Sequence, residues 1–214
     1  MSVFRQPGVL GRSTRRRVVG VTAALSAAAV EMLAVGSWFV LVVDSRTTST
    51  ALAGLGVLFC GSLLRAGVFG ATVSDIGDLL QPRRLGVTVL LTTGWLVWLL
   101  VAELIGAVPG VVVATVVLAG ILTAQFLLEQ RVFRRYASTR VPFTPVVPGL
   151  LLAVGASTLL ATGWFTDWSL TSPPVSLGVT TVVLKIEALH IGVLVFGLFA
   201  FLAHQYRFQR VLDP

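Results

Sequence analysis

The chain has 214 residues, of which 56% are hydrophobic and only 12% are charged, and its formal net charge is +7. Soluble domains carry about 25% charged residues. A water-soluble fold of this size could not cover its surface with so few charged side chains. The composition therefore predicts an all-α integral membrane protein. One cysteine and two histidines allow no intrachain disulfide and no cysteine–histidine metal site, and no cofactor motif is present.

Six apolar stretches are long enough to cross the ~30 Å hydrocarbon core of a bilayer as helices. In chain order they are residues 18–43, 51–73, 85–108, 111–128, 146–165 and 175–203. Residues 1–17 are expected to form a basic tail and residues 205–214 a short second tail. The first stretch exceeds the ~7–15-residue core of a signal peptide, so a retained first helix is expected. The expected fold is a bundle of about six transmembrane helices.

The fourth stretch is the shortest, and only Pro109 and Gly110 separate it from the third. A tight helical hairpin is expected at this dipeptide. A five-helix bundle, in which residues 111–128 form a re-entrant segment, is the alternative. Trp95 and Trp98 lie in the middle of the third stretch and are expected to pack between helices.

Two short fragments recur in the second half of the chain. Residues 63–69 resemble residues 159–165, and residues 85–88 resemble residues 177–180. A repeat of this kind would relate two halves of three helices each, which would then be inverted with respect to one another, as in many transporters. Because Leu, Val and Gly are so abundant, such matches also arise by chance, and the repeat is a weak expectation.

Arginines mark one side of the membrane. Thirteen of the sixteen basic residues fall in the tails and in alternate loops: Arg5, Arg12, Arg15, Arg16, Arg17, Arg83, Arg84, Arg131, Arg134, Arg135, Arg140, Arg207 and Arg210. Arg46 is alone in the remaining loops. The positive-inside rule places both chain termini in the cytoplasm of a multi-pass protein of the cell membrane. Since these arginines lie in short loops, lipid is the expected partner and nucleic acid is not.

Charged side chains inside the hydrocarbon cost about 2.5–3.5 kcal/mol each on insertion scales, and they often mark ion or solute pathways. Five ionisable residues fall inside the expected spans within a slab of roughly 12 Å, at a rise of about 1.5 Å per residue. The candidates are Glu31, Arg65, Lys185, Glu187 and His190. Their depths predict the pairs Glu31–Lys185 and Arg65–Glu187, with His190 one helical turn from Glu187.

The sequence favours a small ion or solute transporter, channel or permease subunit whose site is this polar cluster. A non-catalytic membrane subunit or scaffold, packed against a second copy or another membrane protein, is the alternative. An intramembrane enzyme is a third interpretation, for which Ser157, after Gly155 and Ala156, and His190 are the residues considered. No catalytic residue is assigned, because the residue after Ser157 is Thr158 and not the glycine that such a motif requires.

Overall fold

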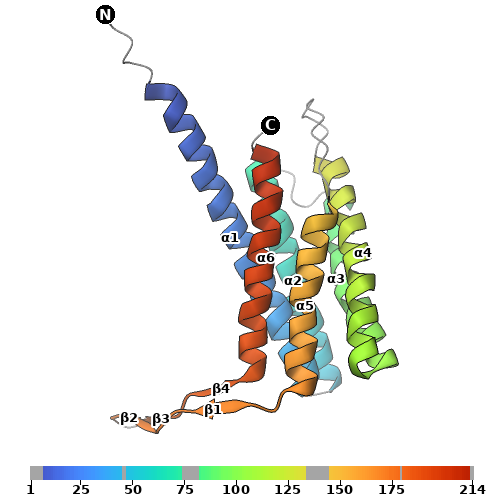
Figure 1. Cartoon of the computed structure of the whole chain (residues 1–214), viewed down its shortest axis with the longest axis vertical. Coiled ribbons are helices and arrows are strands. Elements are labelled where there is room, and N and C mark those ends of the chain that lie inside the picture. The colour runs from blue at the N-terminus through green and yellow to red at the C-terminus, as the bar shows by residue number, and fades with distance from the viewer. Residues whose placement is uncertain (1–6, 45–46, 74–81, 134–144, 179, 213–214) are drawn as a thin grey trace, which may run out of the picture.

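The computed structural model describes residues 7–44, 47–73, 82–133, 145–178 and 180–212. Six long helices dominate it: α1 (Pro7–Asp44), α2 (Thr48–Val73), α3 (Pro82–Ile105), α4 (Ala107–Phe133), α5 (Val146–Phe165) and α6 (Ala188–Leu212) (Figure 1). Each helix contains 20 to 27 consecutive residues that are apolar enough to cross a membrane. The expected all-α bundle of six membrane-spanning helices is therefore confirmed.

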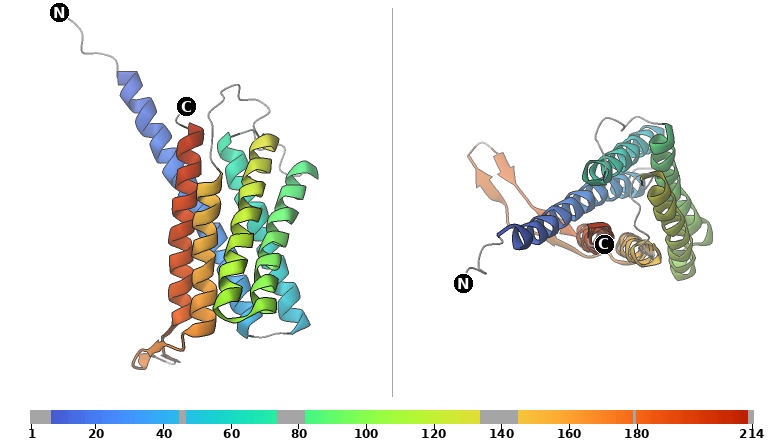
Figure 2. Two further views of the ribbon diagram at one scale, coloured as in Figure 1. Left: turned by 45° about the vertical axis from the view of Figure 1, so that its right-hand side comes forward. Right: turned by 90° about the horizontal axis from the view of Figure 1, so that it is seen from above.

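The bundle closes on itself, because consecutive helices are neighbours and α6 packs against α1 (Figure 2). Among the consecutive pairs, α2 and α3 share the least extensive contact. The start of α1 and the end of α6 lie at the same end of the bundle, here called the terminal end. The opposite end, which carries the connection between α5 and α6, is called the hairpin end.

The connection between α5 and α6 is an extended arm of four short strands. Strand β1 (Ser169–Thr171) pairs with β4 (Lys185–Glu187), and β2 (Val175–Leu177) pairs with β3 (Thr180–Val182), both antiparallel. The arm leans away from the helices (Figures 1 and 2), and its described side chains are exposed except at Ser172 and Glu187, which are partly buried.

The expected last span, residues 175–203, has the wrong start and the wrong end. Its first thirteen residues form β2 to β4, and the helix instead begins at Ala188 and continues to Leu212. The physical reason is local: Pro173 and Pro174 block a helix start upstream, and β-branched Val and Thr residues favour strands. Gly178 adopts a positive φ of 74° between β2 and β3. Residues 205–212 are consequently helix and not a tail.

Two other expected boundaries also shift. Helix α1 begins at Pro7, within the expected tail, because proline suits the first turn of a helix. The turn between α3 and α4 lies at Gly106 and Ala107, whose φ angles are 72° and 48°, and not at Pro109-Gly110. Helix α4 therefore spans 27 residues, and the re-entrant alternative does not describe it.

The arrangement of the helices gives little support to the predicted inverted repeat. Residues 63–69 and 159–165 both lie in helices, α2 and α5. In contrast, Leu85 lies near the start of α3, whereas its counterpart Leu177 ends β2. The second pair of fragments thus occupies places that are not equivalent, and the repeat stays a prediction.

An aromatic layer fills the bundle toward the hairpin end. Trp98 lies 5.6 Å from Trp95, 6.0 Å from Phe39 and 6.4 Å from Trp38, between ring centroids, and Trp95 lies 5.7 Å from Phe196. All five side chains are at most 1% exposed. The expected packing of Trp95 and Trp98 between helices is confirmed. This aromatic layer joins α1, α3 and α6.

Close packing of α1 against α2 depends on Gly61. A Cβ atom there would lie 2.1 Å from the Cβ of Ala34, whereas one at Gly56 of the same helix would meet nothing within 4 Å. Gly61→Ala is expected to lower the free energy of unfolding by roughly 1–3 kcal/mol, because overpacking forces the helices apart. Thermal unfolding in detergent, followed by circular dichroism, measures this loss. Gly56→Ala is the matched control, and equal melting temperatures for the two variants would contradict the prediction.

Candidate functional site

A buried charge cluster lies in the half of the bundle nearer the terminal end. It is made of six side chains from four helices: Glu31 of α1, Arg65 of α2, Gln125 and Glu129 of α4, and His204 and Arg207 of α6. Each is at most 3% exposed. The cluster lies about two helical turns from the aromatic layer, since seven residues separate Glu31 from Trp38 on α1.

Glu129 is the hub of the charge cluster. Its Oε1 accepts hydrogen bonds from Arg65 Nη2 at 2.7 Å and from Gln125 Nε2 at 3.1 Å. Its Oε2 accepts a hydrogen bond from Arg207 Nη2 at 2.5 Å. The two arginine–carboxylate bonds have both partners ionised and are of the strongest type that side chains make. One carboxylate therefore ties α2 and α6 to α4.

Glu31 forms the second centre of the cluster. Its Oε2 lies 2.7 Å from His204 Nε2, and its Oε1 lies 3.6 Å from Arg65 Nη1. Arg65 thus faces both glutamates. Two arginines and two glutamates balance one another, as a buried group of charges requires, and His204 is the additional titratable side chain.

Phe126 supports both guanidinium groups from one side. The guanidinium carbon of Arg207 lies 4.1 Å from the centre of the Phe126 ring, and that of Arg65 lies 5.7 Å from it. Gln125, Phe126 and Glu129 come from about one turn of α4, so their spacing places them on the same face. Cation–π contacts strengthen where the cation is desolvated, as it is here.

The charge cluster is not saturated with hydrogen bonds from the described residues. Glu31 Oε1, Arg65 Nε, Arg65 Nη1 and Gln125 Oε1 are buried without such a partner. Two small cavities of about 10 Å³ adjoin Arg65 on different sides. One is lined by His204, Glu129 and Arg207, and the other by Glu31 and Ser62. A polar cavity of this size has room for about one water molecule.

The structure places only two of the five candidate residues in the charge cluster. Glu31 and Arg65 lie 3.6 Å apart in the charge cluster. Lys185 and Glu187 lie in β4 at the hairpin end, where Lys185 Nζ and Glu187 Oε1 are 2.7 Å apart. The expected pairs Glu31–Lys185 and Arg65–Glu187 are therefore wrong. They assumed that residues 185 to 187 belong to the last membrane helix, whereas this helix begins at Ala188.

The Lys185–Glu187 pair is an exposed ion pair, with its two side chains 58% and 41% exposed. Hydrogen bonding and the charge of Lys185 lower the pKa of Glu187, and the same interactions raise the pKa of Lys185. His190 is also exposed, and its Nδ1 accepts a hydrogen bond from the backbone N–H of Glu187 at 3.0 Å. These residues therefore cap the start of α6 and do not join the buried charges.

Glu129, His204 and Arg207 were missed in the sequence as members of a buried group. The expected fourth span ended at Leu128, directly before Glu129, and the expected sixth span ended at Ala203, directly before His204. The available signal was spacing: Gln125 and Glu129 are four residues apart, and His204 and Arg207 are three apart, so each pair shares a helical face.

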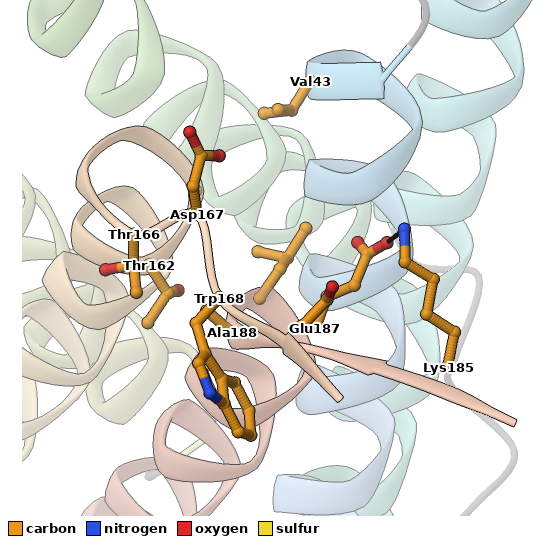
Figure 3. A pocket seen from close by; sticks show the side chains of 11 residues that line it. Val43, Thr162, Thr166, Asp167, Trp168, Lys185, Glu187 and Ala188 are labelled. Atoms are coloured by element: carbon orange, nitrogen blue, oxygen red, sulfur yellow. Dashed lines mark ion pairs between the residues drawn. The ribbon is translucent and has the colours of Figure 1, made fainter. Parts of the chain in front are cut away.

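A second feature is a pocket of about 290 Å³ at the hairpin end, between α1, α5, α6 and the strand arm. Thr162, Asp167, Glu187 and Leu189 are among its lining residues. In Figure 3, Asp167 and Glu187 stand on opposite sides of the pocket, and Lys185 is joined to Glu187. Gly163 at its floor packs toward Phe39, since an added Cβ would lie 3.1 Å from that ring. The aromatic layer therefore separates this pocket from the charge cluster.

Ser157 and His190, the residues considered for an intramembrane enzyme, have other hydrogen-bond partners among the described residues. Ser157 Oγ donates a hydrogen bond to the carbonyl of Val154 at 2.6 Å, on its own helix, and the His190 ring is engaged with Glu187. Among the described residues, no group of three or more His, Cys, Asp or Glu side chains is placed to hold a metal ion.

Glu129→Gln keeps the shape of the hub but removes its charge. The substitution leaves Arg65 and Arg207 buried without their shared counter-ion, so it is expected to lower the free energy of unfolding by roughly 3–5 kcal/mol. Thermal unfolding in detergent provides the measurement. Glu187→Gln, which removes a carboxylate from the exposed pair, is the matched control and should leave the melting temperature unchanged. A similar small effect of both variants would contradict the hub role of Glu129.

Comparison with known proteins adds no assignment to these features. No protein-family model, no curated protein and no solved structure matches the chain significantly. The function therefore has to be inferred from the two polar features themselves: a buried, neutral charge cluster toward the terminal end, and an open polar pocket at the hairpin end.

Proposed function

We propose that this protein is a small transporter, or the permease subunit of one, which moves an ion or a small solute across the cell membrane. The single observation that carries the proposal is the charge cluster, where ionisable side chains of α1, α2, α4 and α6 meet inside the membrane-spanning part of the bundle. Ionisable side chains at this depth are expensive and by default mark a pathway.

The proposed orientation puts the terminal end in the cytoplasm and the hairpin end outside. The arginines of the tails and of alternate loops support it through the positive-inside rule. Arg5, Arg134, Arg135 and Arg140 of that set lie outside the described residues. In this orientation the charge cluster belongs to the cytoplasmic half of the membrane and the polar pocket opens to the exterior.

A cluster that only held the helices together would need fewer charged side chains than this one contains. One neutral pair would be enough to fix the register of two helices, and apolar replacements of buried ion pairs are often at least as stable. This cluster instead contains four charges, a histidine and several polar atoms that accept or donate no hydrogen bond among the described residues. A half-satisfied polar network costs stability, which favours retention for a function.

The proposed transport cycle is alternating access, with the aromatic layer as the barrier. The polar pocket lies on one side of this layer and the charge cluster on the other, and α1 and α6 contribute to all three. A movement of α1 and α6 relative to α3 would part Phe39 and Phe196 from Trp98 and Trp95. Such rocking of helices around a fixed central site is the usual transporter mechanism.

Water access to the cluster tests the proposal. In a Cys60→Ser background, Ser62→Cys is expected to react with a membrane-impermeant thiol reagent, because a transport cycle exposes the cluster to water. Gly120→Cys, on an exposed face of α4 in contact with lipid, is the control that should stay unreactive. Protection of Ser62→Cys from both sides of sealed vesicles would contradict a transport function.

A second function, that of a membrane subunit packed against a partner, is favoured by one specific observation. A groove of about 460 Å³ runs along the weak seam between α2 and α3 and is lined by apolar side chains, Gly56, Thr92 and Thr93. Leu52, Leu55 and Phe59 of α2 face Val89 and Leu96 of α3 across it. Small residues such as Gly56 let a further membrane helix approach closely.

Filling the groove separates the two functions. Gly56→Leu adds a side chain where nothing of the chain lies within 4 Å, so the fold is expected to persist. If a partner helix occupies the groove, the variant should lose the larger assembly that the wild type forms in native membranes, as judged by crosslinking and sedimentation. Gly120→Leu, equally open but on α4, is the control. An unchanged assembly would contradict the subunit function.

A further inference from the structure

We infer that the Glu31–His204 pair is a proton-binding site, and that the ion carried through this protein is a proton which this pair takes up and releases once per cycle. The inference rests on the proposed transport function and names its substrate. It depends on the geometry of the pair, on the charges that surround it, and on the two small cavities beside it.

The pair has the geometry of a proton-sharing unit. His204 Nε2 and Glu31 Oε2 lie 2.7 Å apart, the side chains are 1% and 2% exposed, and they come from different helices, α6 and α1. A free imidazole, unlike a guanidinium, changes its charge near neutral pH, so histidine is a side chain suited to repeated proton uptake and release. Because α1 and α6 are the two helices whose movement relative to α3 would open the barrier, the pair lies within the part of the bundle that moves.

The surrounding charges leave the extra proton uncompensated. The charged groups around the pair are Arg65 from α2, Glu129 from α4 and Arg207 from α6, whereas α5 has no ionisable residue and the described side chains of α3 add none to the cluster. With neutral His204 the cluster sums to zero, and with an added proton it carries one positive charge. Burial of His204 and the two arginines oppose that proton, whereas Glu31 favours it.

The two cavities provide a route to and from the pair. The cavity lined by Arg65, Glu129, His204 and Arg207 lies on the terminal side, and the one lined by Glu31 and Ser62 lies toward the aromatic layer. Ser62 Oγ also accepts a hydrogen bond from Thr92 Oγ1 at 3.4 Å. Single waters in these cavities, together with the hydroxyls, would carry a proton by stepwise hydrogen-bond exchange. Glu31 Oε1 and Arg65 Nη1, which lie 3.6 Å apart without a hydrogen bond between them, supply ligands for such a water.

In each transport cycle the Glu31–His204 pair binds one proton and releases one proton. A proton from the cytoplasmic side forms an N–H or O–H bond on the pair, and after the barrier opens the same bond breaks toward the exterior pocket, or the reverse. One elementary charge crosses the membrane in each cycle, and no bond between heavy atoms changes.

The chain allows a direct test, because His204 and His190 are its only histidines. The full-length protein is labelled with ¹⁵N-histidine in nanodiscs, and imidazole shifts are recorded from about pH 5 to about pH 9, which brackets histidine titration. His190→Gln leaves His204 as the sole signal. The expected result is a titrating His204 whose midpoint moves in Glu31→Gln. A His204 signal that does not change over this range overturns the proton site.

Proton flux is measured in proteoliposomes with an entrapped pH-sensitive dye and an imposed membrane potential. His204→Gln and Glu31→Gln are expected to slow the flux about a hundredfold, the lower end of what a positioned proton-transfer group contributes. His190→Gln, a matched change at the exposed start of α6, should keep the wild-type rate. Glu31→Asp, which keeps the carboxylate, should retain part of the flux where the glutamine variant folds poorly.

The outcomes separate this inference from the transport function. Thiol access to Ser62→Cys together with a silent His204 would overturn the proton site and leave transport of another solute standing. Protection of Ser62→Cys from both sides would overturn transport itself. Equal flux in His204→Gln and His190→Gln would overturn the proton site, whatever the titration shows.

Discussion

The carboxylate of Glu129, placed between Arg65 and Arg207 in a medium that excludes water, is the interaction on which the rest of the bundle depends. A charge at this depth is tolerated only next to an opposite charge, so α2, α4 and α6 have to meet at one point. Glu31 then joins α1 to the same point through His204 and Arg65. Four helices are thereby fixed in rotation and height, and α3 and α5 pack around them.

The bundle divides into two halves of different chemistry because of this arrangement. Toward the terminal end the interior is polar and contains small cavities, whereas toward the hairpin end Trp38, Trp95 and Trp98 fill it with aromatic rings. Aromatic side chains bury large apolar areas when they pack together. Their layer therefore offers an ion little polar surface and resists its entry. The proposed pathway follows from this division: an outer pocket, a closed barrier, and a titratable pair that faces the cytoplasmic side.

Prediction from the sequence succeeded for long apolar runs and failed where a run ended. Glu31 and Arg65 lie inside uninterrupted runs, so their burial was evident, and the structure places them in one cluster. Residues 175–187 are also rich in apolar side chains. Hydropathy does not distinguish a β-branched strand arm from a helix, so the expected frame moved Lys185 and Glu187 into the membrane. The same error moved His204 and Arg207 out of it, where the arginine looked like one more loop charge.

By itself, the sequence determined that the chain crosses a membrane six times, because the hydrophobic effect acts on each segment separately and a helix of about 20 apolar residues satisfies its own backbone. Only the tertiary structure decided which charges are partners. Ion pairing depends on helix rotation, relative height and neighbourhood, which no single segment encodes, and a shift of a few residues in one helix exchanges a buried partner for an exposed one. Thus Glu31 pairs with His204 and not with Lys185.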